Sequence, residues 1–196
     1  GRSIVYQQDI TPLIMNRIRV TMTLALPAFG LAVLFGIFLG VLGAVNRGWI
    51  LDSTINVFAN IGMATPVFWL GILFIYFFSL QLHVLPVQGF TRLSVDFAKG
   101  FKQLIMPVTI LALGPLAVIT RQTRSAMLEV IRQDYIRTGR SKGLKERTLI
   151  VVHAMRNALI PILTVMGMLL GFMIGGSVLV EQVFNIPGMG NMLITA

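Results

Sequence analysis

The sequence has no cysteine and few charged residues. Only 12% of its 196 residues are Asp, Glu, Lys or Arg, whereas 56% are hydrophobic. A soluble domain carries about 25% charged residues, so this chain lacks the polar surface that it would need to remain in water. The absence of cysteine excludes disulfides and thiolate metal ligands within the chain, and it leaves the redox compartment open. The composition therefore favours an integral membrane protein.

Negative charge is also scarce. Seven acidic residues stand against 16 basic ones, which gives a net charge of +9. Such a balance suits nucleic-acid binding only when the basic face belongs to a soluble domain, and the composition excludes such a domain. We therefore expect no nucleic-acid partner. Positive charge on the cytoplasmic loops of a membrane protein explains the excess better.

Four apolar runs are long enough, or nearly so, to cross a bilayer, which takes about 20 residues as a helix. They cover 20–45, 57–80, 104–120 and 158–180, and the third is the weakest because it has 17 residues and two prolines. None shows the alternation of a membrane β-strand, so we expect an all-α polytopic transmembrane bundle with four spans in one domain over 1–196. The chain opens on GRSIVYQQDI and stops at NMLITA, and we interpret it as a fragment truncated at both ends.

The distribution of Lys and Arg predicts the orientation of these spans. The connection 121–156 holds nine basic residues against three acidic ones. Because cytoplasmic loops are enriched in Lys and Arg, we expect this loop to be cytoplasmic. Alternation then places 46–56 inside, and 81–103 and both ends outside. Arg17 and Arg19 lie on the outer side in this topology and count against it without reversing it.

Glycines recur at a spacing of four residues within the spans. Gly36 and Gly40 form one such pair, and Gly167, Gly171 and Gly175 form a ladder. Small residues at this spacing let helix backbones approach closely. Packing between helices is the preferred interpretation, and a helix face that slides during gating is the alternative.

Asp, Glu, Lys, Arg and His are absent from all four predicted spans. Proton- and voltage-driven machines place such groups at membrane depth, so the energy for any transport should come from elsewhere. His83 and His153 fall on opposite sides of the membrane and cannot share a metal ion. The sequence also lacks a metalloprotease motif, a phosphate-binding loop and a nucleophile–base pair. We therefore expect no catalytic residue, no metal site and no cofactor, which argues against an intramembrane enzyme.

The basic connection itself has a helical pattern with one break. Residues 121–132 keep helical spacing, 134–142 read as a further short helix, and 144–152 resume it. Gly143 stands between the last two, where it can end a helix in the left-handed conformation that only glycine adopts at low cost. The pattern predicts two short helices broken at Gly143 and held below the membrane by two spans.

This connection resembles the cytoplasmic "EAA" loop of permease subunits of binding-protein-dependent ABC importers. Arg137, Thr138 and Gly139 occupy the triplet, Gly143 the glycine, and the end of the loop begins at His153, after nine intervening residues. The segments DYIRT, KGL and HAxRNAxIP are similar to the variant of this loop that is found in dipeptide, oligopeptide and nickel permeases. The order of the spans fits this family along nearly the whole chain.

The resemblance implies that the loop is a coupling helix seated in a groove of a cytoplasmic ATPase subunit. The residues implied to face the groove are Tyr135, Ile136, Thr138, Gly139 and Gly143. Those implied to supply hydrogen bonds or electrostatic steering are Arg137, Arg140 and Lys142. The end of the loop is formed by His153, Arg156 and Asn157. Gly139 departs from the family, which usually has Ala there. Glycine inside a helix costs about 1 kcal/mol relative to Ala, which makes the start of the docking helix less certain. Attraction of the basic residues to anionic lipid is the simpler alternative, or an added role.

A second motif follows the last span. Glu181, Phe184, Pro187, Gly188 and Gly190 match a pattern typical of the same family. The resemblance makes this segment part of the extracytoplasmic gate and of the surface that meets a substrate-binding protein. An ordinary turn after a span, which Pro187-Gly188 would form unaided, is an equally good interpretation. We expect Glu181 to be solvated or paired rather than a substrate ligand.

These observations lead to one hypothesis with alternatives. The resemblance implies a multi-pass permease of a bacterial or archaeal cytoplasmic membrane that imports peptides and hydrolyses no ATP itself. Its implied partners are cytoplasmic ABC ATPases, a second permease subunit that forms a heterodimer, an extracytoplasmic binding protein and the lipid bilayer. Nickel or another metal chelate, and glutathione, are alternative substrates. A membrane channel or anchor without an ATPase is a more remote alternative, because it leaves the spacing in the loop unexplained.

Overall fold

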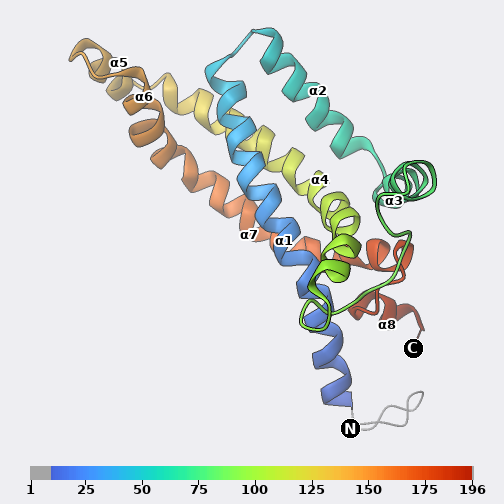
Figure 1. The fold of residues 1–196 in the computed structure, drawn as a ribbon. Helices are drawn as coiled ribbons and strands as arrows, with labels where there is room; N and C mark the ends of the chain where they lie inside the picture. Colours follow the sequence, from blue (N-terminus) through green and yellow to red (C-terminus); the bar gives the residue numbers. More distant parts are fainter. Residues whose placement is uncertain (1–9, 196) are drawn as a thin grey trace. The chain divides into compact units, whose positions relative to one another are not determined.

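The structure is a computed structural model that describes residues 10–195, and all regular structure in this range is helical (Figure 1). Apolar runs form helices because a helix satisfies every backbone hydrogen bond within one segment. In chain order the helices are α1 Ile10–Val45, α2 Ile50–Ala64, α3 Val67–Phe74, the π-helix η1 Ile75–Gln81, α4 Phe97–Ile131, α5 Asp134–Ser141, α6 Glu146–Thr148, the π-helix η2 Leu149–Ala154, α7 Met155–Val183 and α8 Met189–Thr195.

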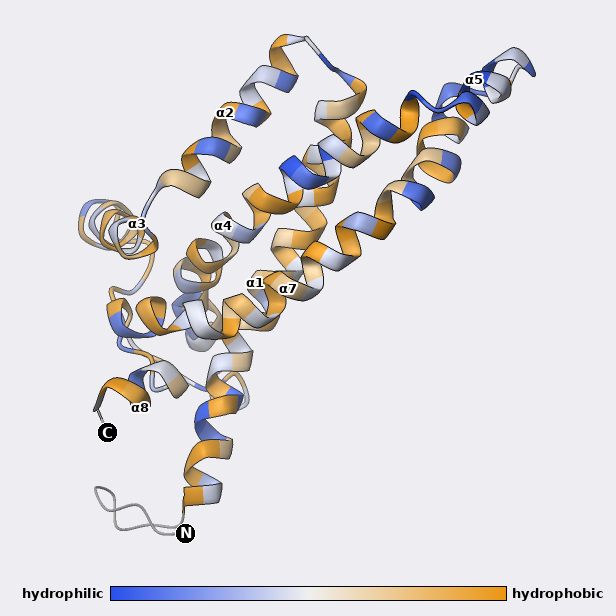
Figure 2. Cartoon of the chain, turned by 180° about the vertical axis from the view of Figure 1, so that it is seen from behind, coloured by the Kyte–Doolittle hydropathy of each residue, from blue (hydrophilic) through white to orange (hydrophobic). Residues whose placement is uncertain are grey.

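The number of possible membrane spans agrees with the sequence. Three helical segments are long and apolar enough to cross a membrane, namely Ile10–Val45, Phe97–Ile131 and Glu146–Val183, and the broken pair Ile50–Ala64 and Val67–Gln81 supplies a fourth if it is counted as one span. Figure 2 shows apolar residues along most of these segments and polar residues on α5. The predicted all-α polytopic fold is confirmed.

The helices are longer than the predicted spans, and one of them is interrupted. The run 104–120 lies within α4, which continues from Phe97 to Ile131 through Pro107 and Pro115. Charged residues mark where a span leaves the hydrocarbon, but they do not end a helix. The run 57–80 breaks instead at Thr65 and Pro66. The residue before a proline is disfavoured in helical conformation, so α2 ends there and α3 begins after it.

The described residues form two compact units. The first contains 10–30, 65–114 and 170–195, and the second contains 31–64 and 115–169. The long helices α1, α4 and α7 therefore contribute residues to both units. The first unit includes α3, η1 and α8, and the second includes α2, α5, α6 and η2.

Close helix packing in the second unit involves the first pair of glycines. A Cβ atom added to Gly36 would lie 2.8 Å from Ile119 Cγ2, and one added to Gly40 would lie 2.6 Å from the backbone oxygen of Thr120. The expectation that small residues allow close approach is confirmed for this pair. The ladder on α7 differs, because in the described part of the chain nothing lies within 4 Å of a Cβ built on Gly167, Gly171 or Gly175.

Candidate functional site

The turn at Gly143 ends α5 in the predicted way. Gly143 has φ +77°, in the left-handed region. The Leu144 N–H donates to the Gly139 oxygen at 3.2 Å, and the Gly143 N–H donates to the Arg140 oxygen at 2.9 Å. This pair of bonds is the Schellman arrangement, which satisfies backbone carbonyls at a helix end and needs a residue without Cβ strain at the turn. The first predicted short helix and the glycine stop are present as α5 and the turn at Gly143. The second predicted short helix, 144–152, is wrong as a separate element, because α6, η2 and α7 form one continuous helix from Glu146 to Val183.

The inner face of α5 packs on the loop that follows it. Ile136 and Gly139 are buried, and a Cβ added to Gly139 would lie 2.6 Å from Leu149 Cδ2. Leu149, the first residue of η2, is itself buried. Alanine at position 139 would require the end of the Leu149 side chain to shift. Ile136 and Gly139 therefore face the core of the loop.

The outer face of α5 is polar and open. Asp134, Arg137, Thr138 and Ser141 are exposed and follow the spacing i, i+3, i+4, i+7 that places residues on one side of a helix. Tyr135 is also exposed, by 45%. Lys142 and Gly143 are exposed at the turn. The surface that the loop presents outward is therefore short and mostly polar, with two basic residues and one acidic residue among the seven.

Two side-chain contacts hold the loop together. The Arg140 guanidinium donates from Nε to Glu146 Oε2 at 3.0 Å and from Nη2 to Oε1 at 2.5 Å, across the Gly143 turn. The hydrogen bonds to this carboxylate raise the pKa of Arg140 above its ordinary value. Asn157 Nδ2 donates to the Tyr135 hydroxyl oxygen at 2.7 Å, which links α5 to the start of α7. The structure thus brings together two residues of the loop motif that stand 22 positions apart.

The remaining residues of the loop end lie on the surface. His153, in η2, and Arg156, in the first turn of α7, are both exposed. Ala154 and Ala158 are buried beside them. The loop end therefore buries its small residues and presents its basic ones.

The motif after the last span forms a cradle around a carboxylate in the first unit. Glu181 is fully buried. Its Oε1 accepts a hydrogen bond from Thr21 Oγ1 at 2.6 Å and lies 3.3 Å from Ser177 Oγ, while Oε2 accepts one from the Asn191 N–H at 3.0 Å. Thr21 Oγ1 in turn accepts a bond from the Met189 N–H at 2.9 Å. The carboxylate therefore ties α1 and α7 to the first turn of α8.

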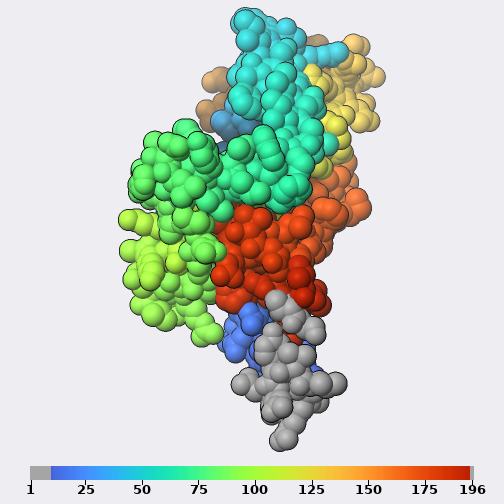
Figure 3. All heavy atoms as spheres, turned by 90° about the vertical axis from the view of Figure 1, so that its right-hand side faces the viewer, coloured from blue at the N-terminus to red at the C-terminus, as the bar shows by residue number. Residues whose placement is uncertain are grey.

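The two glycines of this motif allow close packing around the cradle. A Cβ on Gly188 would collide with the Glu181 carboxylate, and one on Gly190 would lie 2.5 Å from Val178 Cα. Phe184 is buried, and its backbone oxygen accepts a bond from the Gly89 N–H at 3.1 Å. Pro187 is exposed. In Figure 3 the red atoms of the C-terminal segment lie directly beside the green atoms of the region that contains α3 and η1. Glu181 is thus paired with neutral donors, as expected, and it is shielded from solvent.

The loop around Gly143 and the segment 181–190 both lie within a family match found in the sequence. Residues 32–196 match the family described as binding-protein-dependent transport system inner membrane component. The chain belongs to this family.

Relatives within the family carry names that refer to peptides. A protein of Brucella abortus (strain 2308), named as a peptide transport system permease, is 42% identical over 196 residues, which cover 100% of this chain and 62% of the relative. The di/tripeptide transport system permease protein DppB of Pseudomonas aeruginosa (strain UCBPP-PA14) is 38% identical over 216 aligned residues, covering 100% of this chain and 64% of the relative. The chain thus spans somewhat less than two thirds of the length of these relatives.

Solved structures share the fold. One is the MetNI methionine ABC transporter in inward facing conformations, with a TM-score of 0.74 and 20% identity, covering 95% of this chain and 81% of that chain. Another is an amino acid ABC transporter, with a TM-score of 0.73 and 17% identity, covering 100% of this chain and 82% of that chain. At this identity the likeness concerns the fold alone.

In this family member, the sequence did not predict a partly buried ion pair between Asp52 and Arg124. Asp52, at the start of α2, is 4% exposed. It accepts hydrogen bonds from Arg124 Nε at 2.6 Å and Nη2 at 2.8 Å, and a third from the Gly48 N–H at 3.1 Å. Asn56 Nδ2 also donates to Asp52 Oδ1 at 2.8 Å. The pair joins α2 to α4 inside the second unit, and its two residues stand 72 positions apart in the sequence.

Proposed function

We propose that the chain is the pore-forming part of a permease in an ATP-driven importer of peptides. The observation that carries this proposal is the rigid turn around Gly143. It presents one short polar helix, α5, and is fixed to the following span by the Tyr135–Asn157 hydrogen bond. A coupling element needs both properties, since it must dock on a soluble partner and must move a span when that partner moves.

Packing within the loop favours some of its residues over others for contact with an ATPase subunit. Ile136 and Gly139 pack within the loop, and Arg140 is held by Glu146. The proposed contact surface therefore consists of Tyr135, Arg137, Thr138 and Lys142, with Gly143 setting the angle at which α5 is presented. His153 and Arg156 lie at the membrane side of the loop, where they suit anionic lipid headgroups. Hydrolysis of ATP would occur in the partner.

The substrate and the remaining partners follow from the relatives and from burial. The relatives named above are peptide permeases, which favours peptides over nickel chelates or glutathione. Only 17% of the most apolar window of Glu146–Val183 is buried within the chain, against 56% for Phe97–Ile131. This surface would be covered by lipid and by a second permease subunit, which we expect to form a heterodimer with it. The segment 181–190 would face an extracytoplasmic binding protein, in a bacterial or archaeal cytoplasmic membrane.

Arg137→Glu in the full-length permease tests the coupling role. Arg137 has a side chain 74% exposed on the outer face of α5, so the change should leave the fold intact. We expect recovery of the ATPase subunit with the tagged permease to fall by at least about tenfold, as befits the loss of charged hydrogen bonds in an interface. Arg147→Glu makes the same charge change on α6 and serves as the matched control.

Equal recovery of the ATPase with Arg137→Glu and wild type would refute the docking role of α5. An equal loss with both variants would attribute the effect to net charge. Absence of any ATPase from the wild-type preparation would favour a channel or anchor. Binding of dipeptides, glutathione and nickel to the cognate binding protein distinguishes the substrates, and exclusive nickel or glutathione binding would contradict the peptide proposal.

A further inference from the structure

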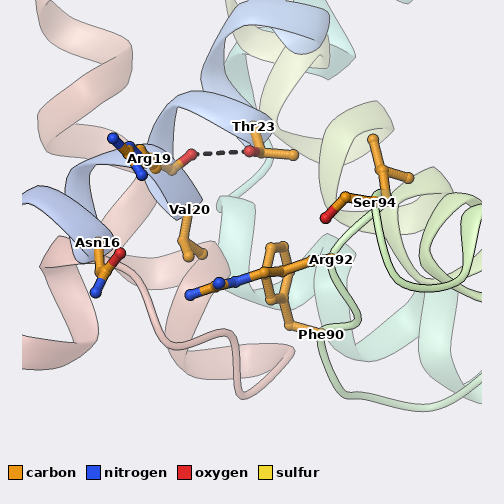
Figure 4. Close-up of a pocket in the computed structure, with 8 residues that line it drawn as sticks. Asn16, Arg19, Val20, Thr23, Phe90, Arg92 and Ser94 are labelled. Atoms are coloured by element: carbon orange, nitrogen blue, oxygen red, sulfur yellow. Dashed lines mark hydrogen bonds between the residues drawn. The ribbon is translucent and has the colours of Figure 1, made fainter.

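A pocket of about 290 Å³ lies in the first unit, between the start of α1 and the segment that precedes α4. Arg19 and Asn16 line it from α1, and Arg92 and Ser94 line it from the segment 82–96. Figure 4 shows the Arg92 side chain extending past the ring of Phe90 toward α1, where Asn16 and Val20 lie. Two arginines from separate parts of the chain therefore line one pocket.

The described lining of the pocket is positively charged. Within residues 10–195, no acidic residue lines the pocket and no carboxylate forms an ion pair with Arg19 or Arg92. The acid nearest to Arg92 in the sequence, Asp96, accepts a hydrogen bond from the Lys99 N–H at 3.0 Å and caps the start of α4. Like charges held together without a counter-ion favour the binding of an anion.

We propose that this pocket binds a phosphate group. A phosphate offers more acceptor oxygens than a carboxylate, and the lining of the pocket includes two arginines, Asn16 and Ser94 as possible donors. The Thr23 hydroxyl is already engaged, since it donates to the Arg19 oxygen at 2.8 Å, which fixes the backbone that carries Arg19 (Figure 4). Val20, Phe90 and Leu93 add apolar walls that suit the glycerol part of a phosphate ester.

The position of the pocket favours a lipid headgroup over free phosphate. Val20 begins the charge-free run of α1, so Arg19 stands where that helix meets the membrane surface. In the predicted topology this is the outer surface, where an arginine is otherwise unexpected. A phosphate ligand gives this residue a role. Both sources present the same group, and the two can be separated by experiment.

The test uses the full-length permease complex in nanodiscs with Arg92→Gln, alone and combined with Arg19→Gln. One arm measures retention of phosphatidylglycerol in mixed phosphatidylcholine nanodiscs by native mass spectrometry. The other measures binding of radioactive inorganic phosphate in pure phosphatidylcholine nanodiscs. We expect each substitution to reduce binding by about tenfold, the size expected for a charge-assisted hydrogen bond.

Arg17→Gln is the matched control, because Arg17 lies two residues from Arg19 on the same helix but does not line the pocket. Binding of phosphatidylglycerol and of phosphate by Arg17→Gln should stay within about twofold of wild type, because this substitution removes no hydrogen bond from the pocket. Pocket-dependent retention of phosphatidylglycerol assigns the site to a headgroup, and pocket-dependent phosphate binding alone assigns it to a free anion. Absence of binding in both arms, or an equal loss with Arg17→Gln, would overturn the proposal. Recovery of the ATPase subunit is measured in parallel and reports on the proposed function separately.

Discussion

Glu181 shows how a single buried residue joins three helices. Its two carboxylate oxygens accept bonds from Thr21 and from the Asn191 backbone, and the side chain is fully buried. A glutamine would place its NH2 group either against the Asn191 N–H, which is also a donor, or against the Thr21 hydroxyl, whose proton then loses its acceptor. An unsatisfied buried polar group costs about 1–3 kcal/mol, so Glu181→Gln should lower the unfolding temperature of the purified permease.

Thermal unfolding in detergent checks this prediction. Gln182→Glu, at the exposed neighbouring position, serves as the control and should leave the unfolding temperature unchanged. Thr21→Val removes the hydroxyl that bridges Glu181 and Met189, and it should destabilise the same cradle. The two effects should then combine less than additively, since both substitutions break one network. Full additivity would contradict a shared network.

Sequence reasoning located some of these residues and missed others for a physical reason. Gly143 could be predicted because a helix stop is a local event that depends on the few residues around it. The Thr21–Glu181 and Asp52–Arg124 contacts join residues 160 and 72 positions apart. Local periodicity contains no information on which distant side chains meet. The residues next to these four in the sequence therefore do not indicate either contact.

At the scale of the helices, sequence predicted which segments are apolar better than where they end. Charged residues led to a short third span, but α4 continues by several residues at each end of 104–120. The glycine ladders likewise looked equivalent in the sequence. Only the pair on α1 packs against another part of the described chain, because the partner of a helix face is decided by the tertiary fold.

This difference predicts that two matched glycine-to-alanine substitutions differ in their effect on stability. Gly40→Ala places a Cβ 2.6 Å from a backbone oxygen of α4, so overpacking should destabilise the permease by about 1–3 kcal/mol. Gly171→Ala has open space around it within the described residues and should leave the unfolding temperature of the isolated permease unchanged. Measuring the unfolding temperatures of both variants tests this prediction. Equal destabilisation would contradict the proposed difference between the two glycine faces.

At the scale of the whole molecule, the stretches 46–56 and 121–156, which we expect inside, belong to the second unit, and 81–103, which we expect outside, belongs to the first. Each long helix contributes residues to both units. The orientation itself remains a prediction from the distribution of Lys and Arg.

Cysteine labelling tests this orientation directly, because the sequence has no cysteine of its own. Val95→Cys, at a position 77% exposed, should react with a membrane-impermeant maleimide in intact cells. Ser53→Cys and Ser141→Cys, also at exposed positions, should react only after the membrane is permeabilised. The full-length protein, freed of any other cysteine, is the proper background. Labelling of Ser141→Cys in intact cells would place α5 outside, where no ATP-driven partner could reach it, and the coupling role would then have to be abandoned.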